Sequence, residues 1–349
     1  MLYQSVCLES IAYTLPDEVV TSDEIEARLA PLYRRLRLPE GRLELMSGIG
    51  RRRLWPRGTR PSGPSAETAE KALVAAGLDR RHVGAVVHGS VCRDFLEPAT
   101  ACVVHQRLGL SRQCAVYDVS NACLGLLSGV LQVADMIELG RIRAGLVMGT
   151  EDSRALLEST IRQLNSDESL SRADIKPAMA SLTIGSASAA ILLVDRGLSR
   201  TGNRLRGGIA RTNSEQCRLC QGGVAETGEP GLLMATDSET LLYEGVATAR
   251  DAFPEFLDQV GWAACGATKT FCHQVGRAHR KLLLETLKLD PAGDFTTFET
   301  LGNMGSVALP ITAAMGLEQG HVRSGDRVAL LGIGSGINVV MLGIDWGSQ

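Results

Sequence analysis

One short stretch of the chain, residues 118–125 (Asp-Val-Ser-Asn-Ala-Cys-Leu-Gly), constrains the fold more than any other. Residues 115–119 have the pattern of a short strand, the chain then turns sharply, and a helix is predicted over residues 123–138. The polar side chains of that helix recur every third residue at Gln132, Asp135 and Glu138, whereas nearly all other positions are apolar. A helix that is apolar on almost every side is a buried one. We therefore expect an α/β fold with this helix at its centre.

Cys123 is expected in the first turn of the buried helix. There its thiol faces free backbone N–H groups and the positive end of the helix dipole, and both favour the thiolate. The sequence therefore presents Cys123 as a candidate nucleophile. The alternative is that Cys123 is simply a small buried hydrophobic residue, and only a partner group elsewhere in the chain decides between the two.

The composition is that of a soluble globular protein. Of 349 residues, 44% are apolar and 21% are charged, which is enough for one large domain or two ordinary ones. The net charge of -3 gives no reason to expect nucleic-acid binding. The first ten residues lack the basic region and long apolar core of a signal peptide, so we expect a cytoplasmic protein.

The cysteines and one long apolar segment argue against a disulfide-rich, a zinc-binding or a transmembrane protein. Nine irregularly spaced cysteines favour reduced thiols over a disulfide framework. Cys217 and Cys220 are the one tight pair, and neither a second pair nor a nearby histidine completes a zinc site, so no metal is predicted. Residues 328–344 are apolar but are interrupted by glycines. Two core strands joined by a glycine turn explain them better than a transmembrane segment.

The first half of the chain alternates strands with helices. Thr21 and Glu24 have the spacing of a capping box ahead of the first predicted helix. Residues 153–179 are more polar and are expected to form a surface insertion. Strands are predicted over residues 5–13, 83–90, 144–149 and 186–194, and helices over residues 25–36 and 65–77.

The second half repeats the order of the first. A strand over residues 268–272 ends at His273, and a helix is predicted over residues 277–287. Asn303 then lies in a glycine-flanked loop before a helix and a strand, as Cys123 does in the first half. This repeat predicts two copies of one α/β unit, over residues 1–197 and 198–349, with Cys123 and Asn303 in related loops.

Two further groups of residues are candidates for a functional site. Glu97 precedes Pro98 in a loop that leads into a helix, and its simplest role is a carboxylate at the helix N-terminus. Its alternative role is a general base whose basicity is raised by apolar surroundings. Residues 51–53 are three adjacent arginines ahead of Trp55, and such a group is either solvated or holds a phosphate while the indole stacks on a base.

A thiol nucleophile needs donors that stabilise negative charge on the carbonyl it attacks. His273 at a strand end and Asn303 between glycines have the right chemistry. Each also has an ordinary explanation, because His273 could be a core histidine and Asn303 could supply a turn conformation. The three residues together are much more specific than any one of them.

With these motifs the sequence resembles the thiolase superfamily, in particular its ketoacyl synthase III group, whose members carry a Cys-His-Asn triad in this order. The resemblance implies a duplicated thiolase fold, a five-layer αβαβα sandwich. Through the segments at residues 93–98 and 330–336, the sequence resembles in more detail the OleA group of acyl-CoA-condensing thiolases of long-chain olefin biosynthesis. The motifs that carry the resemblance lie at residues 48–53, 121–123, 273–275, 302–305 and 330–336.

The resemblance implies an acyltransferase that condenses two fatty acyl-CoAs to a 2-alkyl-3-keto acid through an acyl-enzyme on Cys123. His273 and Asn303 are then catalytic, and Glu97 is the base, contributed across a homodimer. The backbone N–H groups of Cys123 and Ser335 hold the oxyanion. Coenzyme A thioesters are substrates, and no cofactor is implied. Arg51, Arg52 and Gly334 are the residues expected to contact the substrate.

Two rival functions remain open from the sequence. One is a decarboxylating 3-oxoacyl synthase III that uses malonyl-acyl-carrier protein and needs no base such as Glu97. The other is a subunit of a heterodimeric thiolase in a β-lactone pathway. A subunit with only a scaffold role needs none of the four candidate side chains. The final lipid depends on later enzymes.

Overall fold

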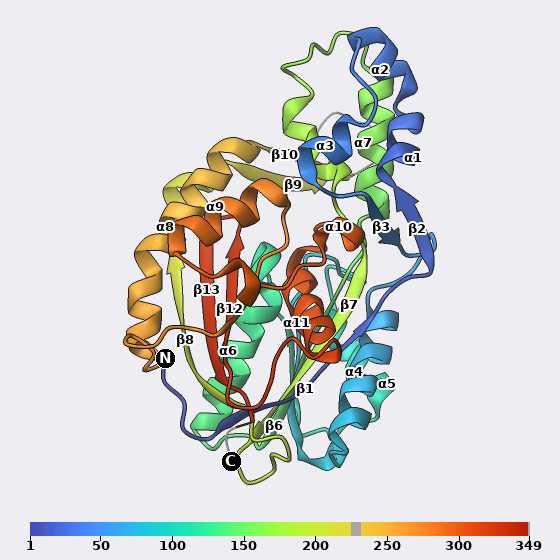
Figure 1. The fold of residues 1–349 in the computed structure, drawn as a ribbon. Helices are drawn as coiled ribbons and strands as arrows, with labels where there is room; N and C mark the ends of the chain where they lie inside the picture. The colour runs from blue at the N-terminus through green and yellow to red at the C-terminus, as the bar shows by residue number, and fades with distance from the viewer. Residues whose placement is uncertain (225–231, 348–349) are drawn as a thin grey trace.

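A nine-stranded mixed sheet runs through the centre of the molecule (Figure 1). The computed structural model describes residues 1–224 and 232–347. Neighbouring strands across the sheet are β11 (Lys269–Cys272), β12 (Arg327–Gly334), β13 (Asn338–Asp345), β8 (Arg204–Thr212), β1 (Val6–Thr14), β7 (Ala187–Asp195), β6 (Ala144–Glu151), β4 (Val83–His88) and β5 (Ala115–Asp118).

The pairing pattern of the strands occurs twice. In the first half β4 is parallel to β6, β6 is antiparallel to β7, and β7 is antiparallel to β1. In the second half β11, β12, β13 and β8 follow one another with the same directions. A single residue pair, Cys7 with Arg204, joins β1 to β8. The duplicated α/β architecture is therefore confirmed, while the exact boundary expected after residue 197 stays a prediction.

Helices form three layers around the two halves of the sheet (Figure 1). The central helices α6 (Gly125–Glu138) and α11 (Ala308–Glu318) share one core with strands of both halves. The outer helices α4 (Ser62–Ala76) and α5 (Thr100–Leu108) cover one outer face, and α8 (Ser238–Gln259) and α9 (Arg277–Leu287) cover the other. Leu126 of α6 and Ile311 of α11 are fully buried, and each such side chain contributes about 2 kcal/mol.

A separate lobe lies at the top of the view in Figure 1. The predicted capping box is present, since Glu24 N–H donates to Thr21 and the Glu24 carboxylate accepts from the Thr21 N–H. The predicted helix over residues 25–36 breaks at Leu29, because α2 begins at Ala30 with Pro31 in its first turn. The elements of the lobe are β2 (Glu18–Thr21), α1 (Ser22–Arg28), α2 (Ala30–Leu36), α3 (Arg42–Ser47), β3 (Arg51–Leu54), α7 (Arg154–Ser166), β9 (Cys220–Val224) and β10 (Leu232–Thr236).

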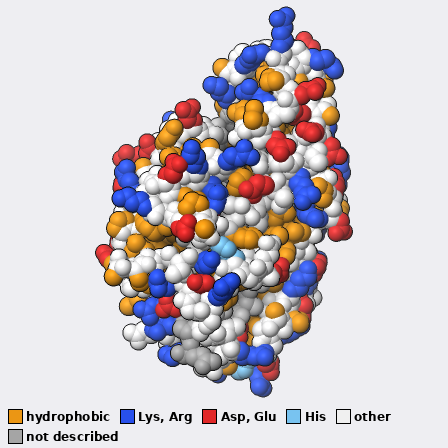
Figure 2. Space-filling view, viewed as in Figure 1, with side chains coloured by type: hydrophobic (Ala, Val, Ile, Leu, Met, Phe, Trp, Pro, Cys, Tyr) orange, Lys and Arg blue, Asp and Glu red, His pale blue; other side chains and the backbone are white. Residues whose placement is uncertain are grey.

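Residues 153–179 contribute α7 to this lobe. Leu157 and Ile161 of α7 pack with Ile25 and Leu32 in a hydrophobic core of their own. Basic and acidic side chains are interspersed over the face shown in Figure 2. In the described part of the chain, no helix is long and apolar enough to cross a membrane. The apolar residues 328–344 form β12 and β13, as predicted.

Two glycines bring the turn between β5 and α6 against the sheet. This turn holds Cys123 and is called the nucleophile turn below. A Cβ atom added to Gly89, just after β4, would lie only 2.5 Å from the carbonyl oxygen of Gly125 at the start of α6. Only glycine at both positions therefore allows this close approach of backbone to backbone. It places the turn that holds Cys123 beside the end of β4.

Candidate active site

The turn between β5 and α6 holds Cys123. Asp118 at the end of β5 accepts hydrogen bonds from the N–H groups of Thr100 (2.8 Å) and Ala101 (2.9 Å), which ties the turn to α5. Ala122 has a φ of 43°, in the left-handed region that non-glycine residues seldom adopt. Cys123 follows in a single 3₁₀ turn, Ala122–Leu124, so it precedes the buried helix and does not lie in its first turn.

The thiol of Cys123 is held in its neutral form. Burial raises its pKa to about 12, and the nearby Cys220 and Glu151 add to the increase. The N–H groups of Ser335 and of Cys123 itself face the sulfur and lower the pKa, but by less. These two N–H groups act in the predicted direction, toward the thiolate, but burial outweighs them and the thiol keeps its proton in the substrate-free protein. A proton must leave the sulfur when it attacks an acyl group.

Gly334 lies directly beside Cys123. A Cβ atom at Gly334 would lie 2.9 Å from Cγ of Leu124 and 3.5 Å from Cβ of Cys123. The missing side chain lets the end of β12 approach the nucleophile turn closely enough for Ser335 N–H to face the sulfur. Gly334 itself is buried, and its expected contact with substrate stays a prediction.

His273 follows β11 at the same edge of the sheet. The backbone N–H of His273 donates to the carbonyl of Leu331 in β12 (3.0 Å). The chain therefore continues the β11–β12 pairing toward Ser335. The side chain is 4% exposed and lies edge-on to His279, with ring centroids 6.5 Å apart. Burial, with a smaller contribution from His279, lowers the pKa of His273 to about 3. The imidazole is therefore neutral at physiological pH and can donate one N–H hydrogen bond.

Asn303 lies in the loop between α10 (Phe298–Leu301) and α11. Its backbone is fixed by two bonds, from Asn303 N–H to the Thr183 carbonyl (3.1 Å) and from Gly185 N–H to the Asn303 carbonyl (2.9 Å). Its side-chain oxygen accepts from Gly305 N–H (3.0 Å). An amide oriented by its oxygen presents its NH₂ group, a donor, on the opposite side.

A buried carboxylate, Glu151 at the end of β6, joins these segments. Its Oε1 accepts from the Ser306 hydroxyl (2.5 Å) and from Val91 N–H (3.2 Å). Burial raises the pKa of Glu151, while Ser306 lowers it. Glu151 therefore joins the Asn303 loop to the loop after β4, and it also helps to raise the pKa of Cys123. Glu151 is not among the candidates that the sequence motifs indicate, although a carboxylate at the end of an apolar strand is a signal of such a site.

Glu97 lies on the loop between β4 and α5. Near its start, this loop contacts Glu151 through the N–H group of Val91. The side chain of Glu97 is exposed, as are those of Phe95 (41%) and Leu96 (98%). The expected apolar surroundings of Glu97 are therefore absent within the described part of one protomer. Among the described residues, no hydrogen bond or ion pair joins Glu97 to the other three candidates.

Two expectations about the arginine segment are corrected. The side chain of Arg52 is fully buried and donates to Ser22 (3.2 Å) and to the Leu182 carbonyl (3.3 Å), so it holds the lobe together and does not reach a phosphate. Trp55 is also buried, and its indole N–H donates to the Glu151 carbonyl (3.1 Å). Arg51 is exposed on β3 and remains the candidate for the phosphates.

Family models match most of the chain. Residues 46–210 match the thiolase N-terminal domain, and residues 257–346 match the C-terminal domain of 3-oxoacyl-[acyl-carrier-protein] synthase III. The resemblance expected from the sequence motifs is thus confirmed for both halves.

Curated relatives and solved structures cover almost the full length. The acyl-CoA:acyl-CoA alkyltransferase of Shewanella oneidensis is 44% identical over 99% of this chain and 100% of its own. The enzyme of the same name from Xanthomonas campestris is 34% identical over 99% of this chain and 100% of its own. The crystal structure of cerulenin-bound Xanthomonas campestris OleA superposes with a TM-score of 0.93 at 34% identity, covering 99% of this chain and 98% of that one. The chain therefore belongs to the thiolase superfamily, with the OleA-type acyl-CoA:acyl-CoA alkyltransferases, and is an acyltransferase.

Proposed function

We propose that this condensing enzyme joins two fatty acyl-CoA molecules head to head, without decarboxylation, to give a 2-alkyl-3-keto acid and two molecules of CoA. The observation that carries the proposal is Glu97, an exposed carboxylate on a loop that begins at the candidate active site. A malonyl substrate forms its carbanion by losing carbon dioxide and needs no base. A plain acyl-CoA must lose an α-proton, and a carboxylate can accept it.

In the first half of the reaction, the sulfur of Cys123 attacks the thioester carbonyl of one acyl-CoA. The N–H groups of Cys123 and Ser335, which face the sulfur, hold the oxyanion. The C–S bond to CoA breaks, and CoA leaves with the proton that the thiol releases. The product of this half is an acyl group bound to Cys123 through a thioester.

In the second half, the partner subunit's Glu97 removes a proton from the α-carbon of a second acyl-CoA. Neutral His273 and the amide of Asn303 donate hydrogen bonds to the enolate oxygen. The carbanion attacks the acyl carbonyl, a carbon–carbon bond forms and the C–S bond to Cys123 breaks. The released sulfur takes up one proton, in balance with the proton that Glu97 removed. Water then hydrolyses the CoA thioester of the product, which releases the 2-alkyl-3-keto acid and the second CoA.

The contribution of Glu97 across a homodimer is supported by its loop. Val91, Phe95 and Leu96 expose 60%, 41% and 98% of their surfaces, which is unusual for three apolar residues so close together. A second copy of the chain would cover them and would remove water from around Glu97. Such apolar surroundings would raise the basicity of its carboxylate.

The proposal is tested by incubating the purified protein with a long-chain acyl-CoA alone and measuring free CoA. We expect continuous release, with two CoA molecules for each molecule of keto acid formed. A decarboxylating synthase would instead release about one CoA per active site as the acyl-enzyme forms, and would turn over only when malonyl-acyl-carrier protein is added. That outcome would favour the rival function, and no release at all would favour a non-catalytic subunit.

A further inference from the structure

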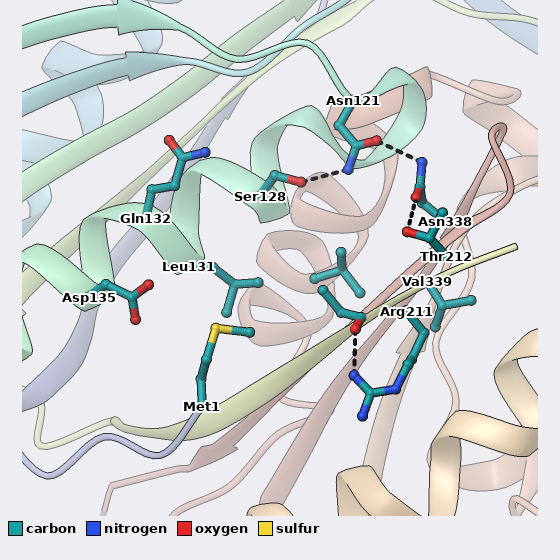
Figure 3. Close-up of a pocket in the computed structure, with 12 residues that line it drawn as sticks. Met1, Asn121, Ser128, Leu131, Gln132, Asp135, Arg211, Thr212, Asn338 and Val339 are labelled. Carbon is teal, nitrogen blue, oxygen red and sulfur yellow. Dashed lines mark hydrogen bonds between the residues drawn. The ribbon is translucent and has the colours of Figure 1, made fainter. Parts of the chain in front are cut away.

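The two N–H groups that face the Cys123 sulfur come from segments far apart in the sequence. One lies in the turn before α6 and the other in the loop between β12 and β13. On the outer side of this junction is a cavity of about 300 Å³, lined by residues of α6, β8 and β13 (Figure 3). The wall of the cavity nearest the nucleophile turn holds two asparagines, Asn121 and Asn338.

A directed chain of hydrogen bonds crosses this wall (Figure 3). The Thr212 hydroxyl donates to the Asn338 Oδ1 (2.7 Å), and the Asn338 Nδ2 donates to the Asn121 Oδ1 (3.0 Å). The Asn121 Nδ2 then donates to the Ser128 hydroxyl in α6 (2.9 Å). Each amide uses its oxygen on one side and its NH₂ group on the other. Turning one amide over would oppose two acceptors or two donors at the Asn121–Asn338 contact, so this contact fixes the orientations of the two amides relative to each other.

The chain of hydrogen bonds joins the turn of Cys123 to the loop of Ser335, close to the two backbone N–H groups. Asn121 lies two residues before Cys123, and Asn338 lies three residues after Ser335. The Asn338 Nδ2 also approaches the Ser335 carbonyl (3.4 Å). A Cβ atom at Gly336 would lie 2.4 Å from the same Nδ2, so the glycine makes room for this amide. The left-handed Ala122 between Asn121 and Cys123 needs its surroundings to hold it in place.

We propose that Asn121 and Asn338 form a clamp that fixes the separation of the Cys123 and Ser335 N–H groups. They are positioning residues for the oxyanion hole and touch neither substrate nor the reacting atoms. The inference rests on the proposed function in one respect, namely that these two N–H groups bind the acyl oxygen. Donors must sit close to the developing oxyanion, so a small separation of the two segments weakens its stabilisation.

The test compares two reactions of Cys123 in the full-length Asn338→Leu variant. Acyl transfer from an N-acetylcysteamine thioester forms an oxyanion, whereas alkylation by iodoacetamide displaces iodide and does not use the oxyanion hole. We expect the acylation rate, followed by intact-protein mass spectrometry, to fall about tenfold or more. The alkylation rate should stay within about twofold, because the thiol and its burial are unchanged.

A matched control is Asn165→Leu, which removes an asparagine whose amide donates to the Arg28 carbonyl in the separate lobe (2.9 Å). This variant should acylate at the wild-type rate. Asn121→Leu breaks the same contact from the other side and should show the same fall in acylation rate. It serves as the test variant if Asn338→Leu does not fold. The double variant should be no slower than either single one, since both remove one clamp.

Either of two results overturns the clamp. One is acylation at the wild-type rate in both single variants, and the other is an equal loss of acylation and alkylation, which would mean only a disturbed thiol or fold. Failure of the proposed function is distinguishable from both. A wild-type protein that acylates from the simple thioester but never condenses two acyl-CoAs would refute the proposed function and leave the clamp standing.

Discussion

Cys123→Ala is expected to form no acyl-enzyme and to lose activity by about four orders of magnitude or more, since a nucleophile that is removed leaves only binding and electrostatic effects. Intact-protein mass spectrometry after mixing with a long-chain acyl-CoA measures this directly. The wild-type protein should gain the mass of one acyl group, and the variant should gain nothing.

The control for this experiment is Cys265→Ala, which removes an exposed thiol elsewhere. It should acylate as the wild type does, because Cys265 lies outside the candidate site. An acyl adduct that persists in Cys123→Ala would place the nucleophile at another of the cysteines, and the assignment of Cys123 would then be wrong.

Glu97→Gln is expected to form the acyl-enzyme at the wild-type rate and to lose condensation by about a thousandfold. A general base contributes on this scale, and glutamine has nearly the same shape but cannot accept the α-proton. Mass spectrometry reports the acyl-enzyme, and extraction of the keto acid reports condensation. The variant should therefore accumulate the intermediate that the wild type consumes.

Glu168→Gln is the matched control for this substitution, because Glu168 is also an exposed carboxylate but belongs to the separate lobe. It should leave both steps unchanged. Loss of acylation as well as condensation in Glu97→Gln would refute the division of roles between Cys123 and Glu97.

Much of the fold follows from local sequence patterns. The buried central helix α6 and the strands β1, β4, β5, β6 and β7 lie within a few residues of their predicted positions, because their apolar runs are long and end at turn residues. α9 matches its predicted range, Arg277–Leu287. The sequence patterns above do not include α8, which is the longest helix among the described residues. Gly245 and Pro254 within it lower its helix propensity, and packing against the sheet compensates.

The environment of single side chains was harder to predict. The three arginines 51–53 look alike in sequence, yet alternation along β3 turns Arg52 inward and leaves Arg51 exposed. The alternation itself follows from strand geometry, because successive side chains of a strand point to opposite faces. The pKa of Cys123 was not available from the sequence, because it depends on burial beneath segments that are distant along the chain.

In the candidate site, too, the individual residues could be predicted from the sequence, whereas the contacts between them could not. Cys123, His273 and Asn303 each end or follow a recognisable strand or loop, so their motifs could be found one at a time. The links between them could not be found, since Glu151 and Asn338 become neighbours of those loops only in the folded chain, and Asn121, although it lies in the turn of Cys123, meets Asn338 only there. The surroundings proposed for Glu97 come from a second subunit, for which one sequence carries no direct pattern.

The central claim is that one active site takes its thiol, imidazole and carboxamide from one protomer and its base from the other. A mixed dimer of a Cys123→Ala protomer and a Glu97→Gln protomer, purified through two different affinity tags, tests this directly. If Glu97 acts across the interface, one of the two sites is complete, and the mixed dimer should show about half of the wild-type condensation activity. A mixed dimer without activity, beside an active wild-type dimer prepared in the same way, would contradict the claim.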